Sequence, residues 1–372
     1  MKIECLKENI SKGISLAEHV TGKKLPLLIL GKVLIEAKEK SIIIKATNLD
    51  IGLEIKVPGK IYTTGIISIN GSLLENHLNN LPEHSVVVME KVNDNFSITT
   101  TASQAVMTCE LPIDYPPIPK FSIGDKIDNF SLEVKAIIDG LVSVVYAAAI
   151  TDIKPELSSV YLHTKESGLT LTATDSFRLA EKKINLSKIE EGNGSTGILI
   201  PQKNATEIIR ILNEAKGLVS VQYNKNQISF QTENSYITSR LIDGLFPSYE
   251  ALLPKSFTTQ IVALKDDILS ALRLVSVFSD RFNQVNIRII PEDGIFELTT
   301  KNQGVGESTT RVEATIEGEA LDITVNARYL ADCFNSINKD SISIGFNGKS
   351  KPALLRAVGD RSFSYLVMPL HQ

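Results

Sequence analysis

The chain has 372 residues, of which 43% are hydrophobic and 22% are charged. This composition is typical of a globular protein, and the length predicts two or three domains because single cores rarely grow past roughly 250–300 residues. The formal net charge is −4, which argues against a protein that grips nucleic acid by neutralising many phosphates, because such proteins usually carry a basic excess.

The N-terminus carries charged residues where a signal peptide has an apolar run, and no stretch approaches the roughly 20 apolar residues of a membrane span. The three cysteines, Cys5, Cys109 and Cys333, are odd in number and widely separated. This pattern is typical of reduced, buried thiols rather than of a disulfide framework. We therefore expect a cytoplasmic protein.

Three similar segments follow one another along the chain, and each begins with an expected amphipathic helix. Apolar residues three and four positions apart lie on one face of a helix and predict a buried stripe. The stripes are Leu6, Ile10, Ile14 and Ala17 in the first segment, Ile137, Leu141, Val144 and Val145 in the second, and Ile268, Leu272, Val275 and Val277 in the third.

A threonine-containing strand recurs in each segment. The stretch 45–56 is repeated as 172–183 and, more faintly, as 298–307, so that Thr47, Thr174 and Thr300 stand at nearly equal intervals. A short apolar strand and a second helix follow each time, and Asn or Pro-Gln precedes the helix as a cap. The second helices are expected at 70–81, 202–216 and 326–337.

Alternating strands close each unit, for example at 219–223 and 227–231, and proline-rich joints separate the units. We call residues 111–119 the first joint and residues 245–254 the second joint. Proline continues neither a helix nor a central strand, so such runs make stiff linkers. The sequence predicts an α+β protein with more strands than helices. Its three tandem domains are expected at 1–122, 123–254 and 255–372.

Three motifs then point to a family. The stretches Ala173-Thr-Asp-Ser-Phe-Arg-Leu-Ala, Gly244-Leu-Phe-Pro-Ser-Tyr and Ser364-Tyr-Leu-Val-Met-Pro-Leu, in this order, resemble the bacterial DNA polymerase III β subunits, or β sliding clamps. The similarity covers nearly the whole chain. The resemblance implies three clamp domains, each with two helices on the inside and antiparallel sheets on the outside. Two chains would close head to tail into a ring of six domains.

The resemblance implies a processivity factor without catalytic residues, metal or cofactor. Its partners would be encircled duplex DNA, a second copy of the chain, the polymerase III catalytic subunit, the clamp loader and other proteins with a clamp-binding motif. No membrane partner is implied, and the site of action would be the bacterial cytoplasm at the nucleoid. Because enclosure retains the DNA, the net charge of −4 is tolerable.

The resemblance also places a peptide pocket beside the second joint, where partner segments with Leu or Phe anchors bury apolar area. Arg178 is expected to orient the peptide, and Met368 to adapt to different ligands. Taken without the resemblance, the C-terminal motif is an ordinary last strand on a core. The expected pocket residues are Leu157, Thr174, Ser176, Phe177, Arg178, Leu179, Pro247, Leu252, Pro352, Leu366, Met368, Pro369 and Leu370.

The chain departs from the family pattern at two places near this pocket. Ser176-Phe177 stands where the family commonly has Gly-His or Gly-Tyr, and His371-Gln372 stands where a basic residue and a leucine are usual. Phe177 is expected to make the pocket floor more apolar. The absence of a terminal leucine is expected to soften one edge.

For DNA-proximal positions the resemblance favours Lys23, Lys24, Lys203 and Arg210, followed by Arg273, Arg281 and Lys339. An ordinary solvated charge is the alternative for each of them, and the six expected inner helices carry no basic excess. The ring seam is expected to use Val106 and Thr108 on an edge strand and Val277 and Phe278 as an apolar patch. Packing into the helix core is the alternative for the last two.

Two other function classes stay open at this stage. A repeat-built protein adaptor would be monomeric and would not be retained on circular DNA. A sugar- or nucleotide-processing enzyme with a β-rich body would show a deep polar pocket with perturbed acids. Against an enzyme, the five histidines lack metal-ligand spacing, and neither a Walker loop nor Gly-x-Gly-x-x-Gly is present.

Overall fold

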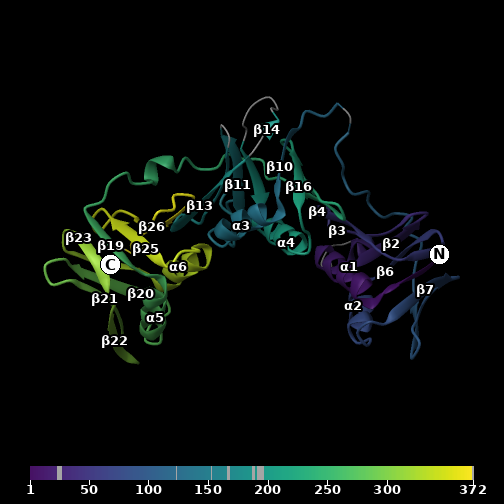
Figure 1. The fold of residues 1–372 in the computed structure, drawn as a ribbon, viewed down its shortest axis with the longest axis horizontal. Coiled ribbons are helices and arrows are strands. Elements are labelled where there is room, and N and C mark those ends of the chain that lie inside the picture. The colour runs from purple at the N-terminus through teal and green to yellow at the C-terminus, as the bar shows by residue number, and fades with distance from the viewer. Residues whose placement is uncertain are drawn as a thin grey trace. The chain divides into compact units, whose positions relative to one another are not determined.

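The computed structural model describes residues 1–22, 27–122, 124–151, 153–165, 168–186, 189–190 and 197–370 (Figure 1). The chain divides into two compact units. Unit 1 comprises Met1–Lys135, Ser187–Gly194 and Lys203–Leu241, and unit 2 comprises Ala136–Leu186, Ser195–Gln202 and Ile242–Gln372.

Unit 1 contains two antiparallel sheets. The five-stranded sheet has the order β5 (Lys60–Thr63), β1 (Lys2–Leu6), β7 (Val86–Val92), β8 (Asn95–Thr99) and β9 (Gln104–Thr108). The nine-stranded sheet has the order β14 (Ile189–Glu190), β10 (Asp128–Glu133), β16 (Leu218–Tyr223), β17 (Gln227–Gln231), β18 (Ser235–Arg240), β4 (Ile51–Val57), β3 (Ser41–Thr47), β2 (Lys32–Lys38) and β6 (Gly65–Asn70). The helices of unit 1 are α1 (Lys7–Val20), α2 (Gly71–Asn79), most of α4 (Gln202–Leu212) and the short η1 (Leu28–Gly31).

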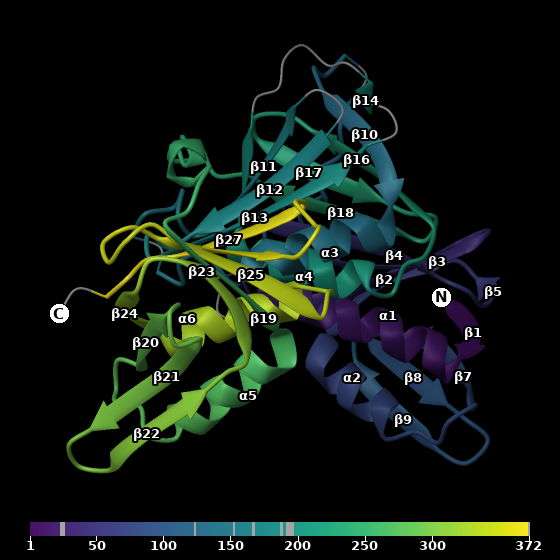
Figure 2. The same cartoon turned by 60° about the vertical axis from the view of Figure 1, so that its left-hand side comes forward.

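Unit 2 also contains two antiparallel sheets. The nine-stranded sheet has the order β15 (Ile198–Pro201), β11 (Ser159–Lys165), β12 (Gly168–Thr174), β13 (Arg178–Asn185), β27 (Phe363–Val367), β26 (Ala353–Ala357), β25 (Ser341–Phe346), β19 (Thr259–Leu264) and β23 (Ala314–Gly318). The four-stranded sheet has the order β22 (Gly306–Arg311), β21 (Ile295–Asn302), β20 (Gln284–Ile290) and β24 (Leu321–Asn326). Its helices are most of α3 (Val134–Val145), α5 (Lys265–Ser276), α6 (Ala327–Asp332), η2 (Glu250–Leu252) and η3 (Cys333–Ser336), and α5 lies beside β21 and β22 (Figure 2).

The predicted apolar stripes are mostly confirmed by burial. Nine of their twelve members are buried, including Ile10 in α1 and Ile268 in α5, and Val145 is half-buried. Two members were wrong. Leu6 is 48% exposed and Val277 is 72% exposed, because Leu6 ends β1 ahead of α1 and Val277 follows the last turn of α5.

The second helices are shorter than predicted, but two of their caps are confirmed. The side-chain oxygen of Asn70 accepts the backbone N–H of Leu73, and that of Asn326 accepts those of Arg328 and Tyr329. Each bond satisfies a donor that the first turn of a helix leaves without an intrahelical partner. In the third segment the α-helix ends at Asp332 and continues as the tighter η3.

The same connection between strand and helix occurs three times and confirms the triple repeat. The last residue of the strand before each first helix pairs with the start of a neighbouring strand, as Leu6 with Val86, Glu133 with Leu218 and Leu264 with Ser341. The next backbone N–H always donates to the carbonyl just before that neighbour: Lys7 to Ser85, Val134 to Gly217 and Lys265 to Asp340. The fold is therefore three tandem domains of mixed helices and antiparallel sheets.

Two strand pairs carry the sheets from one repeat into the next. β18 of the second repeat pairs with β4 of the first inside unit 1, and β13 of the second repeat pairs with β27 of the third inside unit 2. The compact units therefore cut through the second repeat, since part of its strands belongs to each large sheet. The residue limits of the three domains stay a prediction.

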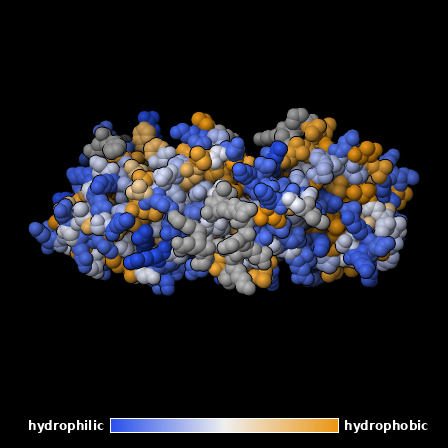
Figure 3. Space-filling model, turned by 90° about the horizontal axis from the view of Figure 1, so that it is seen from above, coloured by the Kyte–Doolittle hydropathy of each residue, from blue (hydrophilic) through white to orange (hydrophobic). Residues whose placement is uncertain are grey.

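The surface seen in Figure 3 mixes hydrophilic and hydrophobic residues, as folded proteins expose both kinds. Cys5, Cys109 and Cys333 are buried free thiols, as predicted. Among the helices of the described ranges, none combines the length and the apolar character that crossing a membrane requires.

Candidate peptide-binding site

A tight turn between β12 and β13 brings four of the predicted pocket residues together. The Thr174 hydroxyl donates to the carbonyl of Arg178 at 2.7 Å and accepts the N–H of Ser176 at 3.1 Å. Asp175 Oδ1 accepts the N–H groups of Phe177 and Arg178, both at 2.9 Å. These bonds hold Ser176 at a φ of 77°, a left-handed conformation that favours glycine, and leave Phe177 57% exposed at the tip.

Next to this turn lies a cavity of about 230 Å³, entirely within unit 2. Its lining includes every residue predicted for the pocket except Pro369 and Leu370, and we call it the peptide pocket. The lining residues are Leu157, Thr174, Ser176, Phe177, Arg178, Leu179, Pro247, Ser248, Tyr249, Leu252, Pro352, Leu366 and Met368. The chain leaves the pocket after Met368, whose N–H donates to the Phe177 carbonyl, and Leu370 then donates to Thr324 of β24.

Ser248 and Tyr249 line the pocket but were missed from the sequence. Both belong to the motif 244–249 that signalled the second joint, so the motif itself was the available signal. His371 and Gln372, for which a softer pocket edge was predicted, lie outside the described residues.

The pocket floor is a preformed apolar cluster. Leu179, Tyr249, Leu354 and Leu366 are buried together, and the half-buried side chains Tyr161, Phe246, Leu253 and Phe257 pack against them. The Phe246 ring meets the Tyr249 ring edge-on at a centroid distance of 5.9 Å, a favourable arrangement for aromatic pairs. A concave apolar site with few polar groups suits the burial of Leu and Phe anchors.

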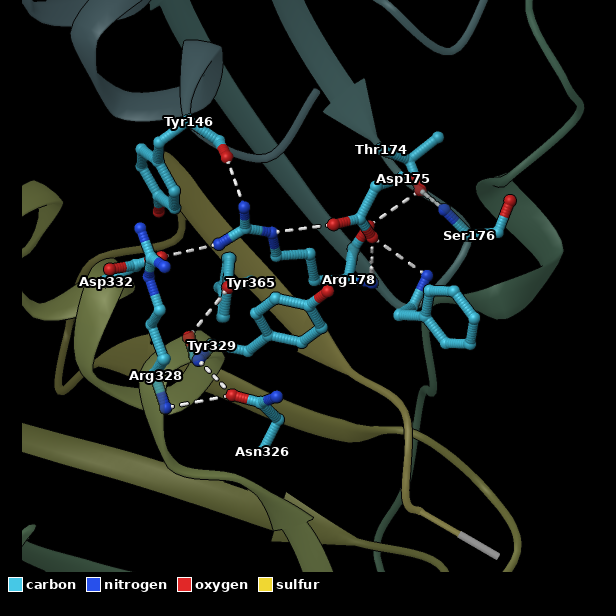
Figure 4. A network of polar contacts seen from close by, with 11 residues as sticks. Tyr146, Thr174, Asp175, Ser176, Arg178, Asn326, Arg328, Tyr329, Asp332 and Tyr365 are labelled. Atoms are coloured by element: carbon cyan, nitrogen blue, oxygen red, sulfur yellow. Dashed lines mark hydrogen bonds and ion pairs between the residues drawn. The ribbon is translucent and has the colours of Figure 1, made fainter. Parts of the chain in front are cut away.

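Arg178 is committed to contacts inside the protein (Figure 4). Its Nε donates to Asp175 Oδ2 at 2.9 Å, its Nη1 to Asp332 Oδ2 at 2.6 Å and its Nη2 to the Tyr146 carbonyl at 2.6 Å. The guanidinium also lies over the Tyr329 ring, 4.4 Å from its centroid, where a cation is attracted electrostatically.

These contacts point to a structural role for Arg178 rather than to the expected role of orienting a bound peptide. Burial opposes its charge, but Tyr365, Asp332 and Asp175 outweigh that effect and raise the pKa of the guanidinium above its ordinary value. A fully charged Arg178 ties the 174–178 turn to the helix α6. We therefore assign it to shaping the pocket rim, because these protein acceptors engage its Nε and both of its terminal nitrogens.

The predicted DNA-proximal residues are dispersed over the chain. Lys203 and Arg210 lie on α4, where Lys203 is exposed and Arg210 is half-exposed. Arg210 Nη1 is 3.6 Å from Glu207 Oε2. Arg273, Arg281 and Lys339 are exposed in unit 2, and Arg281 lies over the Phe282 ring. Lys23 and Lys24 lie outside the described residues.

The predicted seam residues occupy two places. Val106 and Thr108 are exposed on β9, which is an edge strand of the five-stranded sheet. Val277 is exposed beyond α5, so it is not a helix-core residue, while Phe278 is half-buried beside Gly306. β22, which contains Gly306, is likewise an edge strand.

Comparison with known proteins decides the family. Models of the DNA polymerase III β subunit match along nearly the entire chain, the N-terminal domain at residues 1–119, the central domain at 131–248 and the C-terminal domain at 250–371. The chain belongs to the DNA polymerase III β subunit family. The order of its three repeats is thus the order of the three domains in this family.

Known β subunits match this chain over most or all of its length. The Beta sliding clamp of Synechococcus elongatus is 26% identical over 375 residues, covering 100% of this chain and 99% of the relative. That of Staphylococcus aureus is 26% identical over 353 residues, covering 92% of both.

Solved structures of β subunits have the same fold. The DNA polymerase sliding clamp from Bacillus subtilis superimposes with a TM-score of 0.92 at 23% identity, covering 100% of this chain and 99% of that one. The DnaN sliding clamp (DNA polymerase III subunit beta) from Bartonella birtlesii, bound to griselimycin, gives a TM-score of 0.91 at 26% identity with 100% of both chains covered.

Proposed function

We infer that this chain is a DNA sliding clamp that confers processivity on the replicative DNA polymerase. The observation that carries this function is the match of all three β-subunit domain models, in order, along one chain. Two copies would close head to tail into a ring around duplex DNA. A heterologous interface that closes on itself gives such a ring, with domain limits near 1–122, 123–254 and 255–372.

The proposal assigns retention on DNA to enclosure rather than to chemistry. A ring that must slide needs only weak, sequence-independent contacts with phosphates, so a formal net charge of −4 is compatible with this role. Lys23, Lys24, Lys203 and Arg210 are the proposed principal contacts, with Arg273, Arg281 and Lys339 as further ones. The protein would act in the cytoplasm as a non-catalytic factor without a cofactor.

The peptide pocket is the proposed docking site for partners, namely the polymerase III catalytic subunit, the clamp loader and other clamp-motif proteins. Its support is the preformed apolar floor beside a half-exposed Phe177. Burial of two anchor side chains of the Leu or Phe type is worth about 1.5–3 kcal/mol each. Partners would thus share short segments with such anchors.

The proposed ring seam joins the first domain of one copy to the third domain of the other. Its support is the position of β9 at the edge of the five-stranded sheet, as the described residues show it, and the exposed apolar Val277. An edge strand presents unpaired backbone donors and acceptors that a partner strand satisfies. Val106, Thr108 and Phe278 complete the proposed seam.

The decisive experiment separates enclosure from binding. We expect a solution mass near twice the 40.8 kDa of one chain. After loading by its clamp loader and ATP, the protein should stay on closed circular duplex at high salt and be lost when the circle is linearised. Phosphate contacts weaken steeply with salt, so retention at high salt reports enclosure rather than binding. A monomer, or equal retention on circular and linear DNA, contradicts the clamp proposal.

A further inference from the structure

Tyr249 forms the wall between two neighbouring cavities of unit 2. Its side chain lines the peptide pocket of about 230 Å³ and also a second cavity of about 290 Å³. Pro247 and Ser248 of the second joint border both cavities as well. The position of the Tyr249 ring, which is only 5% exposed, therefore decides the shape of the pocket on this side.

The Tyr249 hydroxyl is held from beneath by two residues of the large sheet. It donates to Glu181 Oε2 at 2.8 Å and accepts from the Thr172 hydroxyl at 2.9 Å. Thr172 on β12 and Glu181 on β13 are cross-strand partners, so both project from one face of the sheet. Leu179 of the pocket floor precedes Glu181 by two positions and shares that face.

Glu181 is itself a buried group, with only 4% of its surface exposed. Its second oxygen, Oε1, pairs with Lys183 Nζ at 3.2 Å. Burying a carboxylate is costly unless it is paired and hydrogen-bonded, and a hydrogen bond to an ionised acceptor is stronger than a neutral one. The Tyr249 hydroxyl is thus bound to a strong, stationary acceptor.

We propose that Glu181 and Thr172, neither of which lines the pocket, are positioning residues for partner binding that act through Tyr249. They hold the ring against Leu179 and Leu366, and the ring holds the second joint, so the pocket exists before a partner arrives. A binding site that is already ordered avoids the entropy cost of ordering it on binding. This inference rests on the proposed peptide-binding function.

The test changes one polar group at a time and keeps the apolar shape. In Tyr249→Phe the ring stays but the hydroxyl is lost, and we expect a short labelled peptide with Leu and Phe anchors to bind about 3- to 10-fold more weakly, the range expected for one mobile side chain. Glu181→Gln should produce a smaller loss of the same sign. The double variant should be no weaker than Tyr249→Phe alone, because both changes act on the same hydrogen bond.

A second readout separates positioning from general stability. Without peptide, the backbone amides of Leu252 and Leu253, which donate to Tyr249 and Glu250 of the joint, should exchange hydrogen faster in Tyr249→Phe. Tyr236→Phe is the matched control, because it removes a hydroxyl that donates to Pro119 at the first joint at 2.9 Å. It should leave peptide affinity unchanged.

The possible results are distinguishable. Wild-type affinity in Tyr249→Phe, within twofold, overturns the inference, and so does an affinity loss that Glu181→Gln does not share at all. Unchanged amide exchange in the joint also overturns it. If the wild-type protein itself fails to bind the peptide, or if Leu179→Ala with Met368→Ala binds normally, the peptide-pocket proposal fails instead.

Discussion

The first and second repeats contain equivalent tight turns, at residues 47–51 and 174–178. The joint beside the first turn fills the space next to it, whereas a cavity lies between the second turn and its joint. At the first turn the Thr47 hydroxyl donates to the Ile51 carbonyl and accepts the Leu49 N–H, while Asn48 Oδ1 accepts from Asp50 and Ile51. Thr174 and Asp175 make the same bonds in the second turn. Leu49 and Ser176 share a left-handed φ, 78° and 77°. The repeat thus extends to single hydrogen bonds.

The difference lies five residues after each threonine. At the first joint this position is Gly52, and Ile118 of the joint packs so closely that its Cγ2 would be 2.9 Å from a Cβ added there. At the second joint the position is Leu179, with Leu366 opposite it on β27 and Leu252 from the joint nearby, and these three line the peptide pocket. A joint side chain thus fills the space over the glycine, whereas the leucines surround a cavity.

The residue four positions after each threonine differs too. Ile51 occupies it in the first turn and is buried, whereas Arg178 occupies it in the second and reaches Asp175, Asp332 and Tyr146. In the first repeat this position contributes a buried apolar side chain, whereas in the second it contributes the arginine that shapes the rim of the pocket. Each of the two repeats therefore keeps the same backbone geometry in this turn, while a few side chains decide whether the space beside the joint is filled or hollow.

The largest effect is expected from emptying the pocket. Leu179→Ala with Met368→Ala should weaken binding of the anchor peptide by roughly 4 kcal/mol, about a thousandfold, because two buried anchor contacts are lost. Fluorescence anisotropy measures the affinity. Ile118→Ala at the first joint is the control and should leave it unchanged, and a closed dimer should persist in both proteins. Normal peptide affinity in the double variant would refute the pocket assignment.

The next effect concerns the rim. Arg178→Met leaves the Asp175 and Asp332 carboxylates without their guanidinium, which should lower the free energy of unfolding by about 3 kcal/mol, as breaking a largely buried ion pair does. Denaturant unfolding measures this loss. The matched change at the first turn, Ile51→Met, should cost less than about 1.5 kcal/mol because it conserves apolar volume. Equal losses in the two variants would show that the rim contacts contribute nothing.

A smaller effect is expected from changing the packing of Ile118 against Gly52 at the first joint. Gly52→Ala places a Cβ against Ile118 and Thr238, at 2.9 and 3.1 Å, and should destabilise the protein by about 1–2 kcal/mol through overpacking. Adding Ile118→Ala should relieve the clash, so the double variant should lose less than the sum of the two single changes. Additive losses in thermal unfolding would mean that these residues do not compete for the space.

The smallest effect concerns the strained turn. Ser176→Gly removes the cost of a left-handed serine but frees the unfolded chain, so a net stabilisation of roughly 0.5 kcal/mol is expected. Leu49→Gly at the first turn is the matched change, and there the lost contacts of a larger side chain should reduce the gain. A lower melting temperature for Ser176→Gly than for wild type would contradict the expected strain.

The elements that depend on local pattern could be predicted from the amino-acid sequence alone. The triple repeat, the buried faces around Ile10, Ile137 and Ile268, and the caps Asn70 and Asn326 follow from periodicity and from the donors at a helix start. Most of the pocket residues were also predictable, because the motifs that carry the family resemblance contain them. Tyr249 and Ser248 were in such a motif and were overlooked.

Features that depend on residues far apart in the chain could not be predicted in this way and became visible only in the folded protein. The exposure of Leu6 and Val277 follows from where a strand or helix ends. Arg178 meets Asp332 because β13 of the second repeat pairs with β27 of the third. Glu181 meets Tyr249 because the second joint packs on this sheet. Periodicity identifies the face of a strand but not its neighbour. Whether a joint is filled or hollow therefore had to wait for the packing of Ile118 on Gly52 and of Leu252 beside Leu179.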